Sequence, residues 1–185
     1  MTELTCLVEA AQSGDRQAFA ELYTRYSRMV HGILLARVRP ADADDLVQEV
    51  FVTAMQRLGS LRDPEAIGGW LMTLTRHRAA DHLRREPQTF ELTERVAERA
   101  AAVTPDRADA LAVLEAIRSL PDAYRETLVL RLVEGMTGPE IAERTGLTHG
   151  SVRVNLHRGM QMLRERLNSA YERGLSLGSQ RRTGS

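Results

Sequence analysis

Residues 138–167 read GPEIAERTGLTHGSVRVNLHRGMQMLRERL, a short helical pattern and a long one separated by a glycine. Gly138-Pro139 predicts a helix start with proline in the first turn, and Gly146 predicts the turn that follows. Four apolar residues of the second helix fall within one narrow stripe, which predicts a face packed on the preceding helices: Val152, Leu156, Leu163 and Leu167. This layout is that of a helix-turn-helix.

The remaining surface of that second helix is polar and basic. Such a surface can enter the major groove of DNA, where Asn or Arg reads base edges and other arginines contact phosphates. The alternative is an ordinary amphipathic helix with a solvated arginine face. The short preceding helix and the net charge of +6 over residues 144–185 favour DNA, and the candidate DNA-contacting residues are Ser151, Arg153, Asn155, His157 and Arg158.

The net charge of the whole chain is zero, which at first excludes a generic nucleic-acid binder. The 25 acidic and 25 basic residues, all of the latter arginine, are however unevenly distributed. Residues 1–75 carry −3, residues 76–85 carry +3, residues 86–143 carry −6 and residues 144–185 carry +6. Because salt screens charges beyond about 8–10 Å, the two basic zones act locally despite the neutral total.

Composition and periodicity predict an all-α protein. The chain has 185 residues, 43% of them apolar and only 4% aromatic, and apolar residues recur at helical spacing almost throughout. A transmembrane span, a signal peptide and an internal disulfide are not expected, since there is one cysteine and no long apolar run. We expect a first helical domain at 1–86, a flexible linker at 87–109, a second helical domain at 110–172 and a disordered tail at 173–185.

The predicted first domain holds two charged clusters with more than one interpretation. Acids gather at the start of a helix that Asp42 or Asp44 is expected to cap, so they either favour the helix dipole or dock a basic protein surface. The basic zone at 76–85 is either a solvated helix end or a DNA contact. Trp70 is either part of the core or a platform for an unpaired base. The pattern alone leaves all three pairs open.

No enzyme chemistry is visible in the sequence. None of the five histidines lies in a nucleophile–base pattern, and no phosphate-binding glycine loop is present. A metal site built from His77, Asp81 and His82 lacks a further close ligand. We therefore expect no catalytic residues, no metal and no cofactor.

Three segments in this order resemble the extracytoplasmic-function (ECF) sigma factors, the small two-domain class of bacterial RNA polymerase specificity subunits. They are ADADDLVQEVFVTAMQRL at 41–58, GGWLMTLTRHRAADHLRRE at 68–86 and SLPDAYRETLVLRLVEGMTGPEIAERTGLTHGSVRVNLHRG at 119–159. The resemblance covers about residues 10–170. It implies a region 2 helical bundle followed by a region 4 helix-turn-helix of the sigma-70 family.

The resemblance also implies partners and roles. Region 2 would bind the β′ clamp of core RNA polymerase through Asp44, Asp45, Gln48, Glu49 and Phe51. It would melt the −10 promoter element, with a flipped base held in the loop at 59–69 and with DNA near Trp70, Arg76, His77, Arg78, Arg84 and Arg85. Region 4 would read the −35 element and contact the β flap, and the linker would thread into the RNA path. An anti-sigma factor, a cytoplasmic location and no membrane insertion are further expectations.

Two other functions remain at this point. A stand-alone transcriptional regulator is one, since VRVNL at 152–156 also resembles the recognition helix of LuxR-type response regulators. That function would need a receiver domain of alternating strands and helices, whereas residues 1–86 are predicted to be helical. An interaction module such as an anti-sigma partner is the other, and the two separate basic zones argue against it.

The chain departs from the family pattern at two positions. His77 stands where the family commonly has asparagine, and SVRVNLHRG at 151–159 stands where the family commonly has T-V-K/R-S-R-L-H-R-A. Asn155 thus replaces an arginine, and asparagine pairs with adenine where arginine pairs with guanine. We expect a −35 preference shifted toward adenine at the base facing this residue.

Replacing Asn155 with arginine tests that expectation. Because a bidentate pair contributes about 1–3 kcal/mol of base discrimination, Asn155→Arg should shift selectivity at one −35 position from adenine to guanine by roughly tenfold. Transcription from a library of randomised −35 elements measures this shift. Unchanged selectivity would contradict a base-reading role for Asn155.

Overall fold

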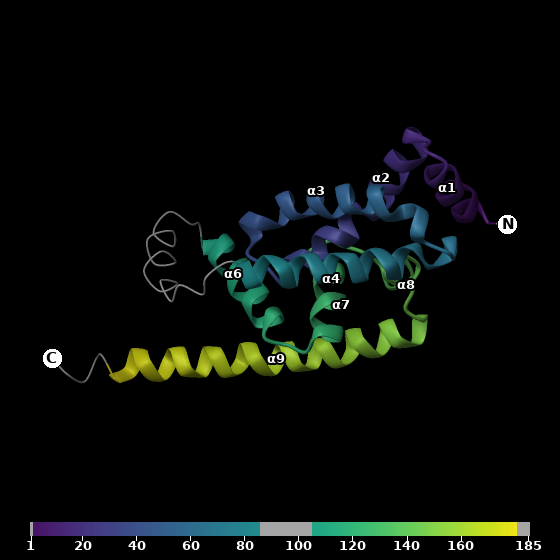
Figure 1. Ribbon diagram of the computed structural model, residues 1–185. Coiled ribbons are helices and arrows are strands. Elements are labelled where there is room, and N and C mark those ends of the chain that lie inside the picture. Colours follow the sequence, from purple (N-terminus) through teal and green to yellow (C-terminus); the bar gives the residue numbers. More distant parts are fainter. Residues whose placement is uncertain (1, 86–104, 181–185) are drawn as a thin grey trace.

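The computed structural model describes residues 2–85 and 105–180, and every element in these two stretches is helical. The all-α prediction is confirmed for this part of the chain. In chain order the elements are α1 (Glu3–Gln12), α2 (Arg16–Leu35), α3 (Pro40–Arg57), the 3₁₀ turns η1 (Leu58–Ser60) and η2 (Pro64–Ala66), α4 (Ile67–Arg85), α6 (Pro105–Arg118), α7 (Asp122–Leu132), α8 (Gly138–Thr145) and α9 (His149–Gln180). Figure 1 shows α3 and α4 on one side of the molecule and α9 running along the other, with α7 between them.

Helix α2 organises the first half of the chain. Its apolar stripe is buried, with Tyr26, Met29 and Ile33 at most 1% exposed, and the helix packs against α1, α3 and α4. Asp15 caps α2 by accepting hydrogen bonds from the amides of Gln17 at 2.8 Å and Ala18 at 3.2 Å. Because α3 and α4 both pack on this helix, it fixes the positions of their charged faces.

The start of α3 differs from the prediction. The helix begins at Pro40 after Arg39, without a side-chain cap, so neither Asp42 nor Asp44 is the capping residue. Proline needs no partner for an amide hydrogen that it lacks, and its fixed φ suits the first helical position, so the helix starts three residues earlier than a cap at Asp42 would place it. Asp44 is thereby left on the exposed surface.

The helix-turn-helix is built as the sequence predicts. Gly146 ends α8 in the left-handed region with φ of +73°, which a side chain would strain. Thr137 and Glu140 form a reciprocal capping box at the start of α8. Thr148 Oγ1 accepts a hydrogen bond from the amide of Ser151 at 3.1 Å and so caps α9.

Two helices extend past the predicted boundaries of the second domain. Helix α6 begins at Pro105, inside the stretch expected to be linker, and α9 continues to Gln180, inside the stretch expected to be disordered. Gly174 and Gly178 each cost roughly 1 kcal/mol relative to alanine, yet extending a formed helix avoids the cost of nucleation. The rest of the predicted linker, residues 87–104, and of the predicted tail, residues 181–185, lies outside the described residues.

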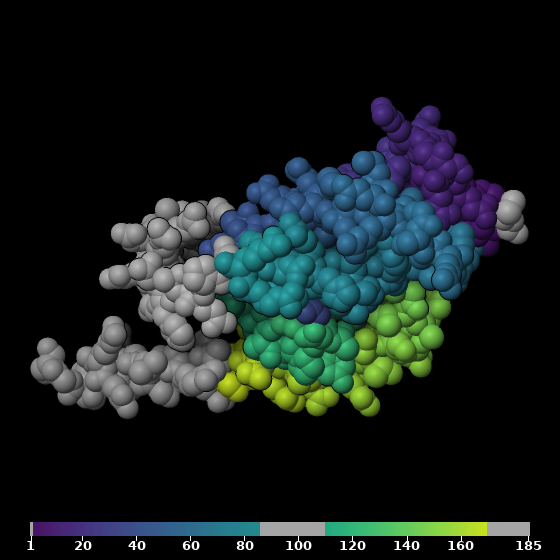
Figure 2. Space-filling view, viewed as in Figure 1, coloured from purple at the N-terminus to yellow at the C-terminus, as the bar shows by residue number. Residues whose placement is uncertain are grey.

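The two halves pack directly on one another. Helix α7 contacts α2, and α8 contacts both α2 and α4, so buried residues of both halves form one core. On the face seen in Figure 2 the two halves meet along a continuous boundary. Polar contacts cross it as well, because Arg118 donates to the carbonyl oxygens of Leu35 and Val38 and Arg25 pairs with Glu143 at 2.6 Å.

The backbones of the two halves approach each other closely at Gly68. A Cβ added to Gly68 would overlap the backbone carbonyl of Arg144 at the end of α8. Since backbone cannot rotate away as a side chain can, Gly68→Ala should lower the free energy of unfolding by about 1–3 kcal/mol. Urea unfolding followed by circular dichroism measures this. Gly59→Ala is the control, since a Cβ there meets nothing within 4 Å, and equal loss in both variants would contradict the close packing.

Candidate functional site

The exposed face of α3 combines acidic, amide and apolar side chains. Predicted polymerase-contacting residues Asp44, Asp45, Gln48 and Glu49 are all exposed. The same face continues along the helix to Val52, 52% exposed, and Met55, 60% exposed. We call Asp45, Gln48, Glu49, Val52 and Met55 the α3 strip. Large exposed apolar side chains beside carboxylates are typical of a protein-binding surface.

Phe51 does not belong to that surface. It is 5% exposed, and its ring lies 4.6 Å from that of Tyr23 and 6.4 Å from that of Phe19, centroid to centroid. Phe51 therefore packs beneath the α3 strip and is not available for a direct contact. Sequence reasoning missed Val52 and Met55. For Val52 a signal existed, because a helix places this residue, seven positions after Asp45, on the same face as Asp45.

The basic zone of α4 is largely paired with acids in this arrangement. Arg78 forms an ion pair with Glu49 of the α3 strip, and Arg84 pairs with Asp81. His77 and Arg85 are exposed, while Trp70 is half-buried and packs against the core. Within the described residues no group of three His, Cys, Asp or Glu side chains could hold a metal, so His77, Asp81 and His82 do not form such a site.

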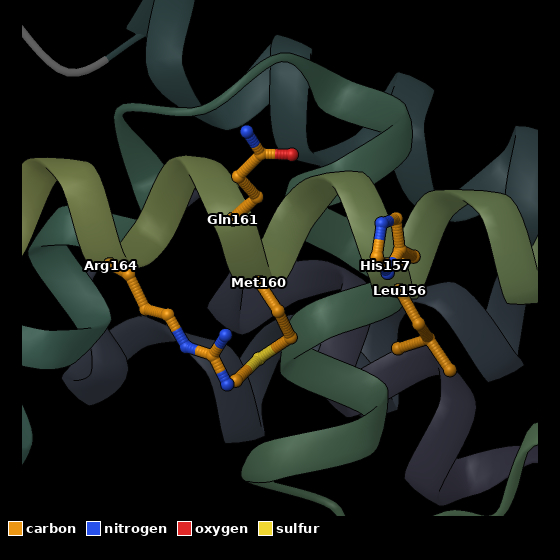
Figure 3. A pocket seen from close by; sticks show the side chains of 5 residues that line it. All are labelled: Leu156, His157, Met160, Gln161 and Arg164. Carbon is orange, nitrogen blue, oxygen red and sulfur yellow. The ribbon is translucent and has the colours of Figure 1, made fainter.

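Helix α9 presents a basic face to solvent. Arg153, His157 and Arg158 are exposed, as is Val154 at 42%. His157 and Arg164 also line a shallow hollow of about 500 Å³ along the helix, together with Leu156, Met160 and Gln161 (Figure 3). These exposed residues include three of the five predicted for the −35 element.

The other two predicted residues have structural partners. Ser151 is exposed, but its hydroxyl lies 2.8 Å from that of Thr148 in the cap of α9. Asn155 is half-buried and lines a cavity of about 60 Å³ that is shared with Met72 and Arg76 of the first half and Glu126 of the second. Asn155 thus points toward the boundary between the halves and not to open solvent.

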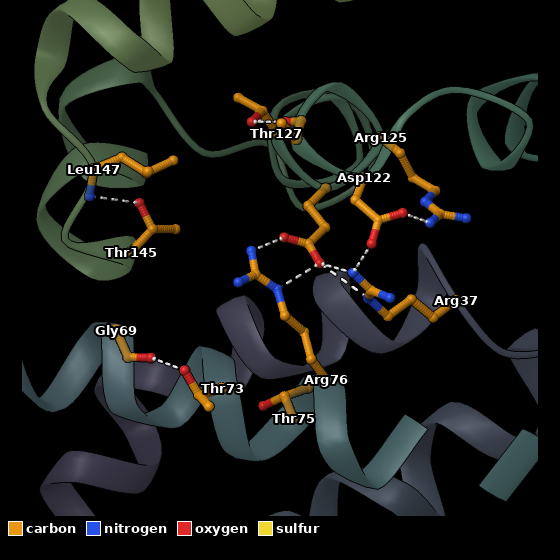
Figure 4. A network of polar contacts seen from close by, with 12 residues as sticks. Arg37, Gly69, Thr73, Thr75, Arg76, Asp122, Arg125, Thr127, Thr145 and Leu147 are labelled. Atoms are coloured by element: carbon orange, nitrogen blue, oxygen red, sulfur yellow. Dashed lines mark hydrogen bonds and ion pairs between the residues drawn. The ribbon is translucent and has the colours of Figure 1, made fainter. Parts of the chain in front are cut away.

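A compact ion-pair network crosses that boundary. Glu126 of α7 accepts hydrogen bonds from Arg37, just after α2, and from Arg76 of α4, while Asp122 accepts from Arg37 at 2.5 Å (Figure 4). The hydrogen bond that Arg76 donates to Glu126 raises the pKa of Arg76 above its usual value, so this arginine stays charged. Sequence reasoning missed Arg37 and Glu126. For Glu126 a signal existed, because a residue four positions before Leu130 lies on the same helix face, and Leu130 is buried.

A second polar cluster joins α2 to the turn after α7. His31 Nδ1 lies 2.7 Å from Glu134 Oε1, and His31 Nε2 lies 3.6 Å from the exposed Asp44. Arg28 approaches Glu134 from the other side at 3.9 Å. The hydrogen bond to Glu134, then the charges of Glu134 and Asp44, raise the pKa of His31 against the opposing effect of burial.

Comparisons with known proteins match this architecture. The family model described as sigma-70 region 2 matches residues 22–88, and that described as sigma-70, region 4 matches residues 110–163. The RNA polymerase sigma factor CarQ of Myxococcus xanthus is 33% identical, with 86% of this chain and 95% of CarQ covered. The ECF RNA polymerase sigma factor BldN of Streptomyces coelicolor is 31% identical over 85% of this chain, which spans 63% of the length of BldN.

A solved structure has the same fold. CnrH, determined in complex with the cytosolic domain of CnrY, is 26% identical to this chain and superimposes with a TM-score of 0.59. The similarity covers 89% of this chain and 97% of CnrH. The likeness therefore extends over both halves of the described structure.

The His31 cluster predicts a pH-dependent stability. Since the pKa of His31 is higher in the folded than in the unfolded chain, its contribution is complete below about pH 6.5 and is lost as the pH rises through the folded value. His31→Gln should flatten the fall in unfolding free energy above pH 6.5, measured by urea unfolding from pH 6 to 9. Exposed His149→Gln serves as the control and should keep the wild-type profile. A wild-type profile in His31→Gln would rule out this contribution.

Proposed function

The chain belongs to the sigma-70 family, in its extracytoplasmic-function group, and we propose that α3, α4 and α9 divide the work of directing RNA polymerase to promoters. The family's members are specificity subunits that direct promoter-specific transcription as alternative sigma factors. The observation that carries the division of work is the order of the matched regions, with an acidic and apolar face in the first and a basic helix-turn-helix in the second.

We assign polymerase binding to the α3 strip. Its carboxylates suit a basic partner surface, and Val52 and Met55 add apolar area that would be buried on docking. In the family this helix docks on the β′ clamp. Glu49 is held by Arg78 in the free protein, so Asp45 and Gln48 with the two apolar residues are the side chains readiest to meet a partner.

DNA contacts are assigned to α4 and α9. Arg76, His77, Arg78, Arg84 and Arg85 line α4, and in the family this segment lies along the −10 element. For the −35 element the exposed Arg153, His157 and Arg158 are the strongest candidates. Val154, exposed among them, offers an apolar contact of the kind that thymine methyl groups accept.

An anti-sigma factor is a further proposed partner. CnrH was solved in complex with the cytosolic domain of CnrY, and a partner of that kind would fit a chain of the same fold. No helix in the described part of this chain is long and apolar enough to cross a membrane. We place the site of action in the cytoplasm, where promoters and core polymerase are found.

The stand-alone regulator is disfavoured by the first half of the chain. A receiver domain requires strands alternating with helices, whereas residues 2–85 form helices only and match sigma-70 region 2. The direct test is run-off transcription of genomic fragments with purified core polymerase. A sigma factor gives discrete starts that share two promoter elements; a stand-alone regulator gives none without another sigma factor.

The polymerase contact is tested by reversing one charge of the α3 strip. Asp45→Arg would set like charges against a basic partner, and its affinity for core polymerase should fall at least tenfold, measured by surface plasmon resonance. Val52→Ser should weaken binding several-fold through lost apolar burial. Both side chains are exposed, so the free energy of unfolding should change by less than about 0.5 kcal/mol.

Glu21→Arg is the matched control, because it makes the same reversal at an exposed position of α2. Its affinity for core polymerase should stay within twofold of wild type. Equal losses in Asp45→Arg and Glu21→Arg would mean that overall charge, and not the α3 strip, governs docking.

A further inference from the structure

Glu126 is the one charged residue that is buried among the described residues, at 4% exposure. Its Oε1 accepts from Arg37 Nε at 3.0 Å and Nη2 at 2.8 Å, and from Arg76 Nε at 3.0 Å. Its Oε2 accepts from Arg76 Nη2 at 2.6 Å. One carboxylate from the second half therefore accepts hydrogen bonds from two guanidinium groups of the first half.

Both arginines depend on α7 for their acid partners in the described structure. Arg37 pairs with Asp122 and Glu126, and Arg76 pairs with Glu126. If the halves separate, two guanidinium groups are left side by side on the first half without those anions. Two planar forks that converge on one oxygen-bearing anion suit a phosphate as well as a carboxylate.

Arg76 lies in the basic zone of α4, which we have assigned to promoter DNA. Arg37 is contributed by a different segment, after the end of α2, and meets Arg76 only through Glu126. We propose that Arg37 and Arg76 form a binding site for a backbone phosphate of promoter DNA, and that Glu126 occupies this site in the free protein as an internal competitor. The proposal rests on the proposed sigma-factor function.

The closed arrangement also covers part of the −35 helix, although the basic face of that helix stays exposed. Asn155 of α9 lines the same small cavity as Arg76 and Glu126, so separation would uncover it together with the phosphate site. Elements named −10 and −35 lie about 25 base pairs apart, which is about 85 Å of duplex at 3.4 Å per pair. A compact chain of this length has a radius of gyration of only about 16 Å, so both elements are reached only after the halves part.

The first test uses the free full-length chain and a fluorescent 30-base-pair duplex of arbitrary sequence, because phosphate contacts do not depend on sequence. Glu126→Gln should bind the duplex about tenfold more tightly than wild type, measured by anisotropy. The slope of log affinity against log salt should steepen by about 0.9, since one phosphate contact is gained. Wild-type affinity and slope in Glu126→Gln would overturn the competition.

Two further variants separate this site from a general change of charge. Glu115→Gln removes one negative charge from an exposed acid of α6, which pairs with Arg118 within the same half, and should stay within twofold of wild type. The double variant Glu126→Gln/Arg37→Gln should lose most of the gained affinity, because one of the two guanidinium groups that hold the phosphate is gone. A double variant that binds like Glu126→Gln would exclude Arg37 from the site.

If Glu126→Gln does not fold, run-off transcription by the holoenzyme tests the same phosphate site. With core polymerase, Arg37→Gln should lose run-off transcription at a lower salt concentration than wild type, while exposed Arg16→Gln should not. Equal salt dependence in Arg37→Gln and wild type overturns the phosphate site. No promoter-specific transcript from the wild type would instead reject the proposed function.

Discussion

A carboxylate held between two guanidinium groups ties the second half of this chain to the first. Burying an isolated charge is costly, and removing one partner of a buried pair costs about 3–5 kcal/mol because the other is left unpaired. Glu126 therefore determines how the two halves fit together more than it adds to the free energy of their association. Separation into water restores the hydration of Glu126, Arg37 and Arg76. Apolar contacts between α7, α8 and α2 supply the packing around it.

The neutral total charge has a structural meaning in this light. Asp122 and Glu126 of α7 pair with Arg37 and Arg76 of the first half, and Glu49 of α3 pairs with Arg78 of α4. Much of the charge that the sequence presents as alternating zones is thus paired internally in the folded chain, while the basic face of α9 stays exposed.

The helices and the helix-turn-helix could be predicted from the sequence because each depends on residues that are close in the chain. Asp15 caps α2, Gly146 takes a positive φ, and Tyr26 and Ile33 belong to a stripe of helical period. Contacts across the boundary depend on residues about 50 to 120 positions apart, such as Arg76 with Glu126 and Arg25 with Glu143, and no local pattern encodes them. Phe51 lies on the apolar side of its helix, as its spacing implies, and its polymerase contact was expected only from the family resemblance. Asn155 is half-buried because it lines the cavity between the halves, which its local sequence does not encode.

The account depends on a closed free chain that opens on polymerase. The direct measurement is the distance between single fluorescent labels at Glu21 of α2 and Gln161 of α9, both exposed, in the free chain and bound to core polymerase. The account predicts one short distance in the free chain and an increase of tens of ångströms in the complex. An equal distance in both states, or a free chain that is already extended, would contradict it.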